Sequence, residues 1–129
     1  MKPFRLTKKI PITIFRYAQG EYINGDWVIG SPTSVSIEAN IQPMSYHETL
    51  QFPESERTKK WCNVWTEFLI RTNREGITGW NADLFYWQGD LYEIRKVQYW
   101  SMGVLDHYHA QASRLEITPD GIPSPEDLN

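Results

Sequence analysis

Residues 33–41 (TSVSIEANI) alternate polar and apolar side chains without interruption, and this pattern constrains the fold more than any other in the chain. Successive side chains of a β-strand point to opposite faces, so the segment predicts a strand with one buried face. The expected buried positions are Val35, Ile37, Ala39 and Ile41. The segment Ile10–Tyr17 has the same period of two and predicts a second strand of this kind.

Two tight turns predict hairpins. Asn24-Gly25-Asp26 lies between short apolar runs, and Asn and Gly tolerate the positive φ angles that such turns need. Gln88-Gly89-Asp90 joins residues 82–87 to residues 91–100 in a second hairpin. There we expect Leu84 and Tyr86 to face Tyr92 and Ile94 across the strands. We also expect a turn at residues 101–103 and a last strand over 104–117, whose first part could instead form a helix.

The segment of residues 43–60 interrupts this series of strands. Pro43 should end its strand, because proline has no N–H for the ladder. Ser45 and Glu48 match a capping box, which predicts a helix start. Pro53 limits that helix to about two turns. Residues 54–60 are polar and either add another turn or remain an exposed loop.

Residues 61–72 (WCNVWTEFLIRT) are apolar on both faces, which predicts a strand covered on two sides. Residues 73–81 contain Gly76 and Gly79 and predict a loop. About six strands separated by short turns, without alternating long helices, indicate a mainly β fold. We expect a small antiparallel β-barrel or sandwich, with one short helix in a long loop and a flexible C-terminal tail.

The charge balance divides the chain. There are 13 basic and 16 acidic residues, and the last twelve residues hold three acids and no base, so residues 1–117 are neutral. We expect a single domain over 1–117 and a flexible, Pro-rich, acidic tail over 118–129 that stays free or docks on a partner. The zero net charge of residues 1–117 argues against a protein whose main function is to bind nucleic-acid phosphates. The bases Lys2, Arg5, Lys8 and Lys9 predict a solvated N-terminal segment.

The sequence predicts neither a membrane span nor a secretory leader, because no apolar run is long enough to cross a bilayer and the charged start lacks a cleavage pattern. We therefore expect a protein made and assembled in the cytoplasm.

No set of residues predicts catalysis. Cys62 lies inside a predicted strand, where a buried and inert thiol is expected. His107 and His109 fall on one strand face, a spacing used in metal sites, but no further residue has ligand spacing. Serine-nucleophile and phosphate-loop motifs are missing. We expect no enzyme, no cofactor and no metal site.

Several motifs, taken in order, resemble the small head-completion proteins of tailed bacteriophages, the head–tail joining, stopper or neck family. The strand at residues 39–43 (ANIQP) is similar to the start of that family's pattern. Residues 52–57 (FPESER) resemble its Leu-Pro-Glu-Gly-x-Arg loop, with Ser55 in place of the usual Gly. Residues 82–89 with Tyr92-Glu93-Ile94 resemble its hairpin. Trp100, His107-Tyr108, Ala110, Ala112 and Arg114 are similar to its closing strand.

The resemblance implies a virion structural protein that forms a ring in the neck, between the portal or adaptor protein and the tail, and retains packaged DNA. Implied partners are other copies of the chain, the portal or adaptor, and the tail-terminator or tail tube protein, with packaged DNA as a further contact in the channel. Alternatives are a tail-terminator or tail-completion protein and, in another class, a barrel that stacks single-stranded bases on its many aromatic rings.

The long segment 43–60 is the expected interface, because connections of this length are often functional. Arg57 is expected to make a charge-assisted bond to a neighbouring carboxylate. The candidate interface residues are Pro43, Met44, Tyr46, Phe52, Pro53, Glu54, Arg57, Lys59 and Lys60.

Overall fold

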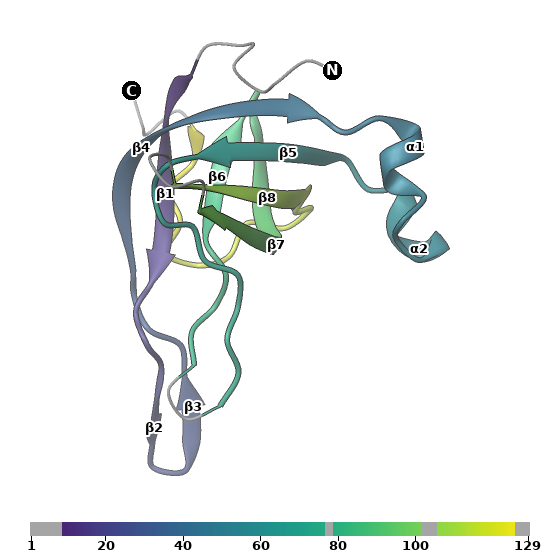
Figure 1. The fold of residues 1–129 in the computed structure, drawn as a ribbon. Helices are drawn as coiled ribbons and strands as arrows, with labels where there is room; N and C mark the ends of the chain where they lie inside the picture. Colours follow the sequence, from purple (N-terminus) through teal and green to yellow (C-terminus); the bar gives the residue numbers. More distant parts are fainter. Residues whose placement is uncertain (1–8, 77–78, 102–105, 126–129) are drawn as a thin grey trace.

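A computed structural model describes residues 9–76, 79–101 and 106–125, and these form a closed antiparallel β-barrel (Figure 1). Around the barrel the strands follow the order β1-β4-β5-β8-β7-β6. Their bounds are β1 Ile10–Tyr17, β4 Pro32–Pro43, β5 Trp61–Thr66, β6 Leu84–Trp87, β7 Asp90–Ser101 and β8 Asp106–Arg114. The chain is therefore mainly β, as predicted, and of the two expected architectures, barrel or sandwich, it has the closed antiparallel barrel.

Side chains from alternate strand positions fill the barrel. In β4, Ile37 and Ala39 are buried while Ser36 and Glu38 are exposed, as the alternation predicted. Val35 differs from the prediction, since it is 39% exposed. The main cluster of buried residues comprises Ile12, Ile14, Ile37, Ala39, Cys62, Val64, Ile70, Phe85, Tyr92, Ile94, Ala110 and Ala112.

Both predicted tight turns are present. Asn24 and Gly25 have φ angles of 52° and 86°, and Gln88 and Gly89 have 52° and 85°. Two successive positive φ angles match the twist of a hairpin. The first turn joins β2 (Glu21–Ile23) to β3 (Asp26–Val28), which form a separate two-stranded sheet.

The register of the second hairpin differs from the prediction. Its turn places Trp87 opposite Asp90, so Phe85 pairs with Tyr92 and Tyr86 with Leu91, whereas Leu84 and Tyr86 were expected to face Tyr92 and Ile94. Phe85 and Tyr92 consequently enter the main core. Leu84 and Leu91 belong to a second cluster with Phe15, Tyr17 and Ile122.

The structure corrects three further expectations, each of which concerns a segment of the chain. Strand β5 ends at Thr66, not at residue 72, because the Thr66 hydroxyl accepts a hydrogen bond from the N–H of Phe68 and the chain turns away. The long loop holds two short helices instead of one, α1 (Tyr46–Thr49) and α2 (Glu54–Arg57). Strand β8 is extended over its described length, paired to β5 and β7, so the helical alternative for its first part is wrong from residue 106.

The C-terminal segment also differs from the expected free tail as far as residue 125. Ile122 is buried against the second cluster, and the Tyr86 hydroxyl donates to the Pro123 carbonyl at 2.8 Å. The segment therefore packs on the outer face of β1, β6 and β7, where the residues of that cluster lie. Lys2, Arg5 and Lys8, most of the expected turn at 101–103, and the acids Glu126 and Asp127 lie outside the described residues. In the part that is described, no helix is both long and apolar enough to cross a membrane.

Candidate functional site

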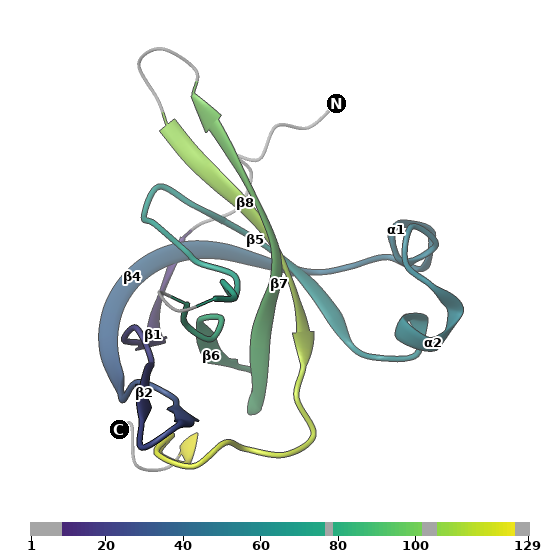
Figure 2. The same cartoon turned by 90° about the horizontal axis from the view of Figure 1, so that it is seen from below.

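Residues 43–60, here called the two-helix arm, extend from one side of the barrel (Figures 1 and 2). The predicted capping box is present: the Ser45 hydroxyl accepts from the Glu48 N–H at 3.3 Å, and Glu48 Oε1 accepts from the Ser45 N–H at 2.9 Å. Arg57 donates to the carbonyls of Phe52 at 2.8 Å and Leu50 at 3.3 Å. Its guanidinium thus closes the turn between α1 and α2, and a bond from Arg57 to another subunit's carboxylate stays a prediction.

Trp61 fastens the arm to the outer face of β5. The Phe52 ring stacks on the Trp61 indole with 3.9 Å between ring centroids and 10° between planes. The indole N–H donates to the Glu56 carbonyl at 2.7 Å. Arg95 from β7 lies 5.6 Å from the indole centroid and 3.3 Å from the Glu56 carboxylate. These contacts explain why β5 is apolar on both faces: one face lines the core and the other supports the arm.

A second attachment is a chain of polar side chains. Asn63 donates to Glu48 Oε2 at 2.9 Å, and its carbonyl oxygen lies 2.9 Å from His109 Nε2. This arrangement requires the His109 tautomer that carries its proton on Nε2. The imidazole also stacks on Trp65, with 4.9 Å between centroids and 4° between planes. His109, one of the two candidate metal histidines, therefore links β8 to β5 and, through Asn63, to the arm.

The pKa values of this chain follow from its burial. Desolvation lowers the pKa of His109, and the nearby Glu48 carboxylate only partly opposes that shift. Burial by itself would raise the pKa of Glu48, but hydrogen bonds from Ser45 and Asn63 outweigh it and leave the pKa lowered. Neutral His109 and ionised Glu48 are thus the forms that the fold stabilises.

The arm and the barrel enclose a hollow of 310 Å³, here called the basic hollow. It lies beside the β6–β7 turn, and six of the nine predicted interface residues line it: Pro43, Met44, Tyr46, Arg57, Lys59 and Lys60. The other three do not. Phe52 stacks on Trp61, and Pro53 and Glu54 are exposed where α2 begins.

Sequence reasoning missed the other side of the basic hollow. The residues that complete it are Thr49, Trp61, Trp87, Gln88 and Tyr92. They come from the arm, from β5 and from the β6–β7 hairpin, and no local pattern connects them. The surplus of aromatic residues next to a tight turn was the available signal. The lining includes three cationic side chains, but Lys59 pairs with Glu56 at 3.1 Å and Lys60 pairs with Asp90 at 3.0 Å, so the chain itself compensates much of this positive charge.

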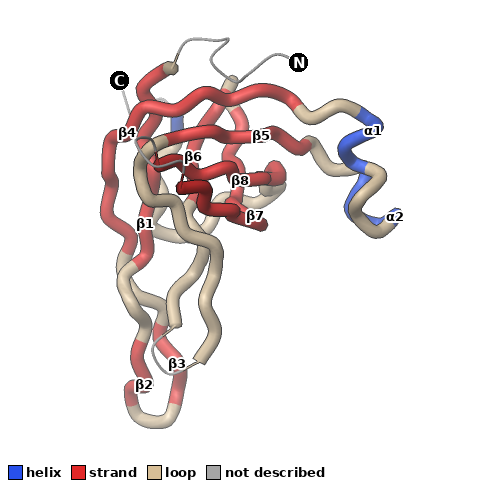
Figure 3. The backbone as a smooth tube through the Cα atoms, in the orientation of Figure 1, coloured by secondary structure: helices blue, strands red, loops and turns tan. Residues whose placement is uncertain are grey.

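A second projection is the hairpin stalk, residues 18–31, which contains β2 and β3. Figure 3 shows it with the loop residues 67–76 and 79–83 running alongside. The Gly20 N–H donates to the Gly79 carbonyl at 3.0 Å, which ties stalk to loop. Trp27 lies across Gly20, where an added Cβ would be only 2.5 Å from the indole. The stalk is thus a packed structure rather than a free hairpin.

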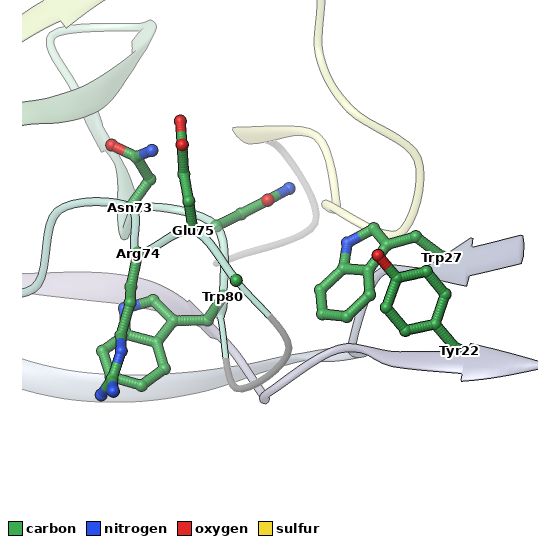
Figure 4. Close-up of a pocket in the computed structure, with 8 residues that line it drawn as sticks. Tyr22, Trp27, Asn73, Arg74, Glu75 and Trp80 are labelled. Atoms are coloured by element: carbon green, nitrogen blue, oxygen red, sulfur yellow. The ribbon is translucent and has the colours of Figure 1, made fainter.

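An open groove separates the stalk from this loop (Figure 4). Tyr22 and Trp27 meet edge to face on the stalk side, with 5.1 Å between ring centroids. On the loop side the guanidinium carbons of Arg71 and Arg74 lie 4.2 and 5.1 Å from the centroid of Trp80. Trp80 therefore already has cationic neighbours from its own chain.

Asp83 anchors the base of the stalk. Its side chain is fully buried and accepts from Arg16 Nη2 at 2.8 Å and from the Arg71 N–H at 2.8 Å. The Arg71 guanidinium donates to the Tyr17 carbonyl at 2.8 Å, immediately before the stalk. One carboxylate therefore joins β1, the loop and the start of β6.

The residues considered for chemistry lie in structural positions. Burial raises the pKa of the Cys62 thiol to about 12, so the thiol stays protonated at neutral pH, as the prediction of an inert cysteine required. Among the described residues, no three or more His, Cys, Asp or Glu side chains are grouped so as to hold a metal ion.

No family model and no curated protein matches the chain.

Proposed function

We propose that the chain is a structural protein of the virion neck of a tailed bacteriophage. It is a head-completion or stopper protein that joins other copies of itself in a ring between the portal or adaptor and the tail, and that retains packaged DNA. In this role the protein acts by binding neighbouring proteins and not by catalysing a reaction. The motif resemblance suggests the family, and one structural observation carries the proposal: a two-helix arm held rigidly away from a closed barrel.

The closed barrel favours such a role. Closure removes the free strand edges through which sheets usually associate, so contacts between copies must use the projections. The arm contacts its barrel through Trp61 and Asn63 but leaves the basic hollow open. A projecting element that is held at two attachments and leaves a partly aromatic hollow open beside it is typical of an interface.

Exposed aromatic rings support a second candidate, the binding of single-stranded nucleic acid. On β7, Tyr99 and Trp100 are 54% and 48% exposed, and such rings can stack bases. Binding of a labelled oligonucleotide at low and high salt tests this candidate. Submicromolar, salt-sensitive binding would favour it over the neck protein.

Electron microscopy of phage particles made without the protein tests the neck role. We expect heads that package DNA, leak it and fail to receive tails. DNA-filled heads that already carry tails would contradict the proposal.

A variant with a shortened arm tests whether the arm is needed for assembly. Pro43 pairs with Cys62, and the Met44 N–H donates to the Trp61 carbonyl at 3.1 Å, so the ends of the arm are adjacent. A turn of about four residues can therefore replace it. We expect this variant to fold, judged by cooperative unfolding, and to give no assembled necks. Normal virions from it would refute a role for the arm.

A further inference from the structure

A cleft of 530 Å³, here called the stalk-base cleft, lies between residues 29–32 at the base of the stalk and residues 115–121 of the C-terminal segment. These two segments are adjacent, since a Cβ added to Gly121 would lie 3.5 Å from Pro32 Cγ. Figure 2 shows the C-terminal segment, in yellow, running from the end of β8 toward the stalk. A cleft of this volume is of the size that proteins use to bind small organic groups.

The floor of the stalk-base cleft is the outer face of three neighbouring strands. Tyr17 of β1, Leu84 of β6 and Glu93 of β7 line it. Glu93 lies opposite Leu84 in the β6–β7 ladder, and it shares a strand face with Leu91 of the second apolar cluster. The cleft therefore places a carboxylate on a surface that is otherwise largely apolar.

The stalk-base cleft carries uncompensated negative charge. Glu93 and Asp120 both line it, and its described lining contains no Lys, Arg or His. The ion pairs among the described residues use other acids, which are Glu56, Glu67, Asp83 and Asp90. Acids on a partly apolar wall favour a guest of opposite charge.

Two arginines on neighbouring segments are engaged elsewhere. Arg95 follows Glu93 by two residues on β7, but its guanidinium pairs with Glu56 at 3.3 Å. The Arg71 guanidinium donates to the Tyr17 carbonyl at 2.8 Å. No described cation therefore pairs with either carboxylate of the stalk-base cleft.

The Tyr17 hydroxyl is a third polar group of the stalk-base cleft. The Tyr17 side chain is only 5% exposed, yet its hydroxyl makes no hydrogen bond to a described residue. A buried phenol usually has a hydrogen-bond partner. Burial raises the pKa of this phenol, and the charge of Glu93 adds to the shift, so the two groups are close to each other. Both oxygens can accept a hydrogen bond from one cationic donor.

The rim of the stalk-base cleft is apolar. Ile29 on the stalk side is 52% exposed, and Ile117 on the C-terminal side is 82% exposed. Side chains of this kind gain free energy when an apolar group covers them. The cleft thus combines an apolar rim with a floor of unpaired hydrogen-bond acceptors.

We propose that the stalk-base cleft binds a primary ammonium group carried on an apolar stem. An ammonium has three N–H donors and no acceptor, so it can bond the Glu93 carboxylate and the Tyr17 oxygen together. The stem would lie between Ile29 and Ile117. A lysine side chain of a partner chain and a free alkylamine share this chemistry. The proposal concerns a small-ligand site and is independent of the neck role.

Three probes separate the charge from the stem. Hexylammonium carries both, 1-hexanol carries the stem alone, and the ammonium ion carries the charge alone. In NMR titrations of the full chain at neutral pH, we expect hexylammonium to shift the amide signals of Gly30 and Gly121. We expect it to bind at least about tenfold more tightly than either other probe. Equal binding of hexanol, or shifts confined to other parts of the chain, would overturn the proposal.

Variants of the cleft test the polar groups. Glu93→Gln with Asp120→Asn should weaken hexylammonium binding at least about tenfold and leave hexanol binding unchanged. Tyr17→Phe keeps the buried ring and should weaken it about fivefold. As a matched control, Glu38→Gln with Glu54→Gln removes two exposed carboxylates outside the cleft and should change binding less than about twofold. An equal loss in the control and in the cleft double variant would overturn the proposal.

A peptide with the sequence of residues 1–9 distinguishes the two sources of the ammonium group, because it carries three lysines and apolar side chains. If it displaces hexylammonium with at least about tenfold higher affinity, the ligand is a lysine of a partner chain, such as a second copy. If it binds no better than hexylammonium, the ligand is a free alkylamine. A peptide whose basic residues are all replaced by Gln should not compete, and displacement of hexylammonium by that peptide would refute recognition of a cation.

Discussion

Removal of the Asp83 carboxylate is the perturbation with the largest expected effect. Asp83 is fully buried, and Arg16 donates to both of its oxygens, at 3.2 and 2.8 Å. The Arg71 N–H provides a third bond at 2.8 Å. Asp83→Ala leaves all three donors without their acceptor in a site that water enters poorly.

The structure sets the magnitude. Breaking a buried ion pair by removing one partner costs about 3–5 kcal/mol. The Arg16 side chain is 22% exposed, so water replaces part of what it loses, and the low end of the range applies. Burial lowers the pKa of Arg71, and the Asp83 carboxylate counters that shift, so the variant also leaves the like charge of Arg16 uncompensated near Arg71. We expect a loss of about 3 kcal/mol, which for a chain of this length lowers Tm by roughly 10 °C.

Urea and thermal unfolding of Asp83→Ala measure this loss against two references. Glu67→Ala removes an exposed pair with Lys9, whose side chains are 51% and 47% exposed, and should cost less than about 1 kcal/mol. Arg16→Met combined with Asp83→Leu replaces the pair by apolar groups and should recover part of the loss. If Asp83→Ala costs less than about 1 kcal/mol, the carboxylate does not hold the stalk base as argued.

Three further changes probe the arm and the stalk. The fold lowers the pKa of His109 below its ordinary 6.5, so its contribution to the free energy of unfolding is fully present above pH 6.5 and is lost as the pH falls toward the lowered pKa. His109→Gln should flatten this part of the profile of unfolding free energy against pH. Gly20→Ala places a Cβ 2.5 Å from Trp27, so we expect increased proteolysis within the stalk at unchanged barrel circular dichroism, and equal cleavage would contradict the packing. Phe52→Ala removes the ring stacked on Trp61, so we expect Trp fluorescence to shift to the red. We expect the free energy of unfolding to fall by about 2–3 kcal/mol, which is less than for a fully buried Phe because Phe52 is half-buried. No change in either signal would mean that other contacts hold the arm.

The barrel was predictable because its information is local. Strict alternation in β4 and two turns with glycine predict most of the inward-facing residues and both hairpins. The sequence left open whether the strands form a barrel or a sandwich, because the pairing of β1 with β6 that closes the barrel joins segments about seventy residues apart. The end of β5 at Thr66 could not be predicted from the sequence, because Phe68 and Leu69 continue the apolar run and only a side-chain hydrogen bond turns the chain. The docking of Ile122 was missed for a similar reason: a single apolar residue among prolines has no periodicity.

The candidate sites were predictable only in part. The arm was found from its capping box and prolines, and from its unusual length between two strands. The far wall of the basic hollow was missed because Trp87 and Tyr92 reach it from a hairpin about thirty residues later. The Arg16–Asp83 pair at the stalk base spans 67 residues of sequence, and charge patterns along a chain do not show which charges meet across a barrel.

Rigidity in both projections bears on how a ring of this protein would assemble. Ordering flexible segments opposes association, whereas surfaces that are already ordered avoid much of that cost. The stalk is held by Asp83 and by packing over Gly20, and the arm is held by Trp61 and Asn63. A weak contact between such surfaces leaves copies separate at low concentration. In the proposed neck role, a portal or adaptor template would raise their effective concentration, and the ring would then close only on that template.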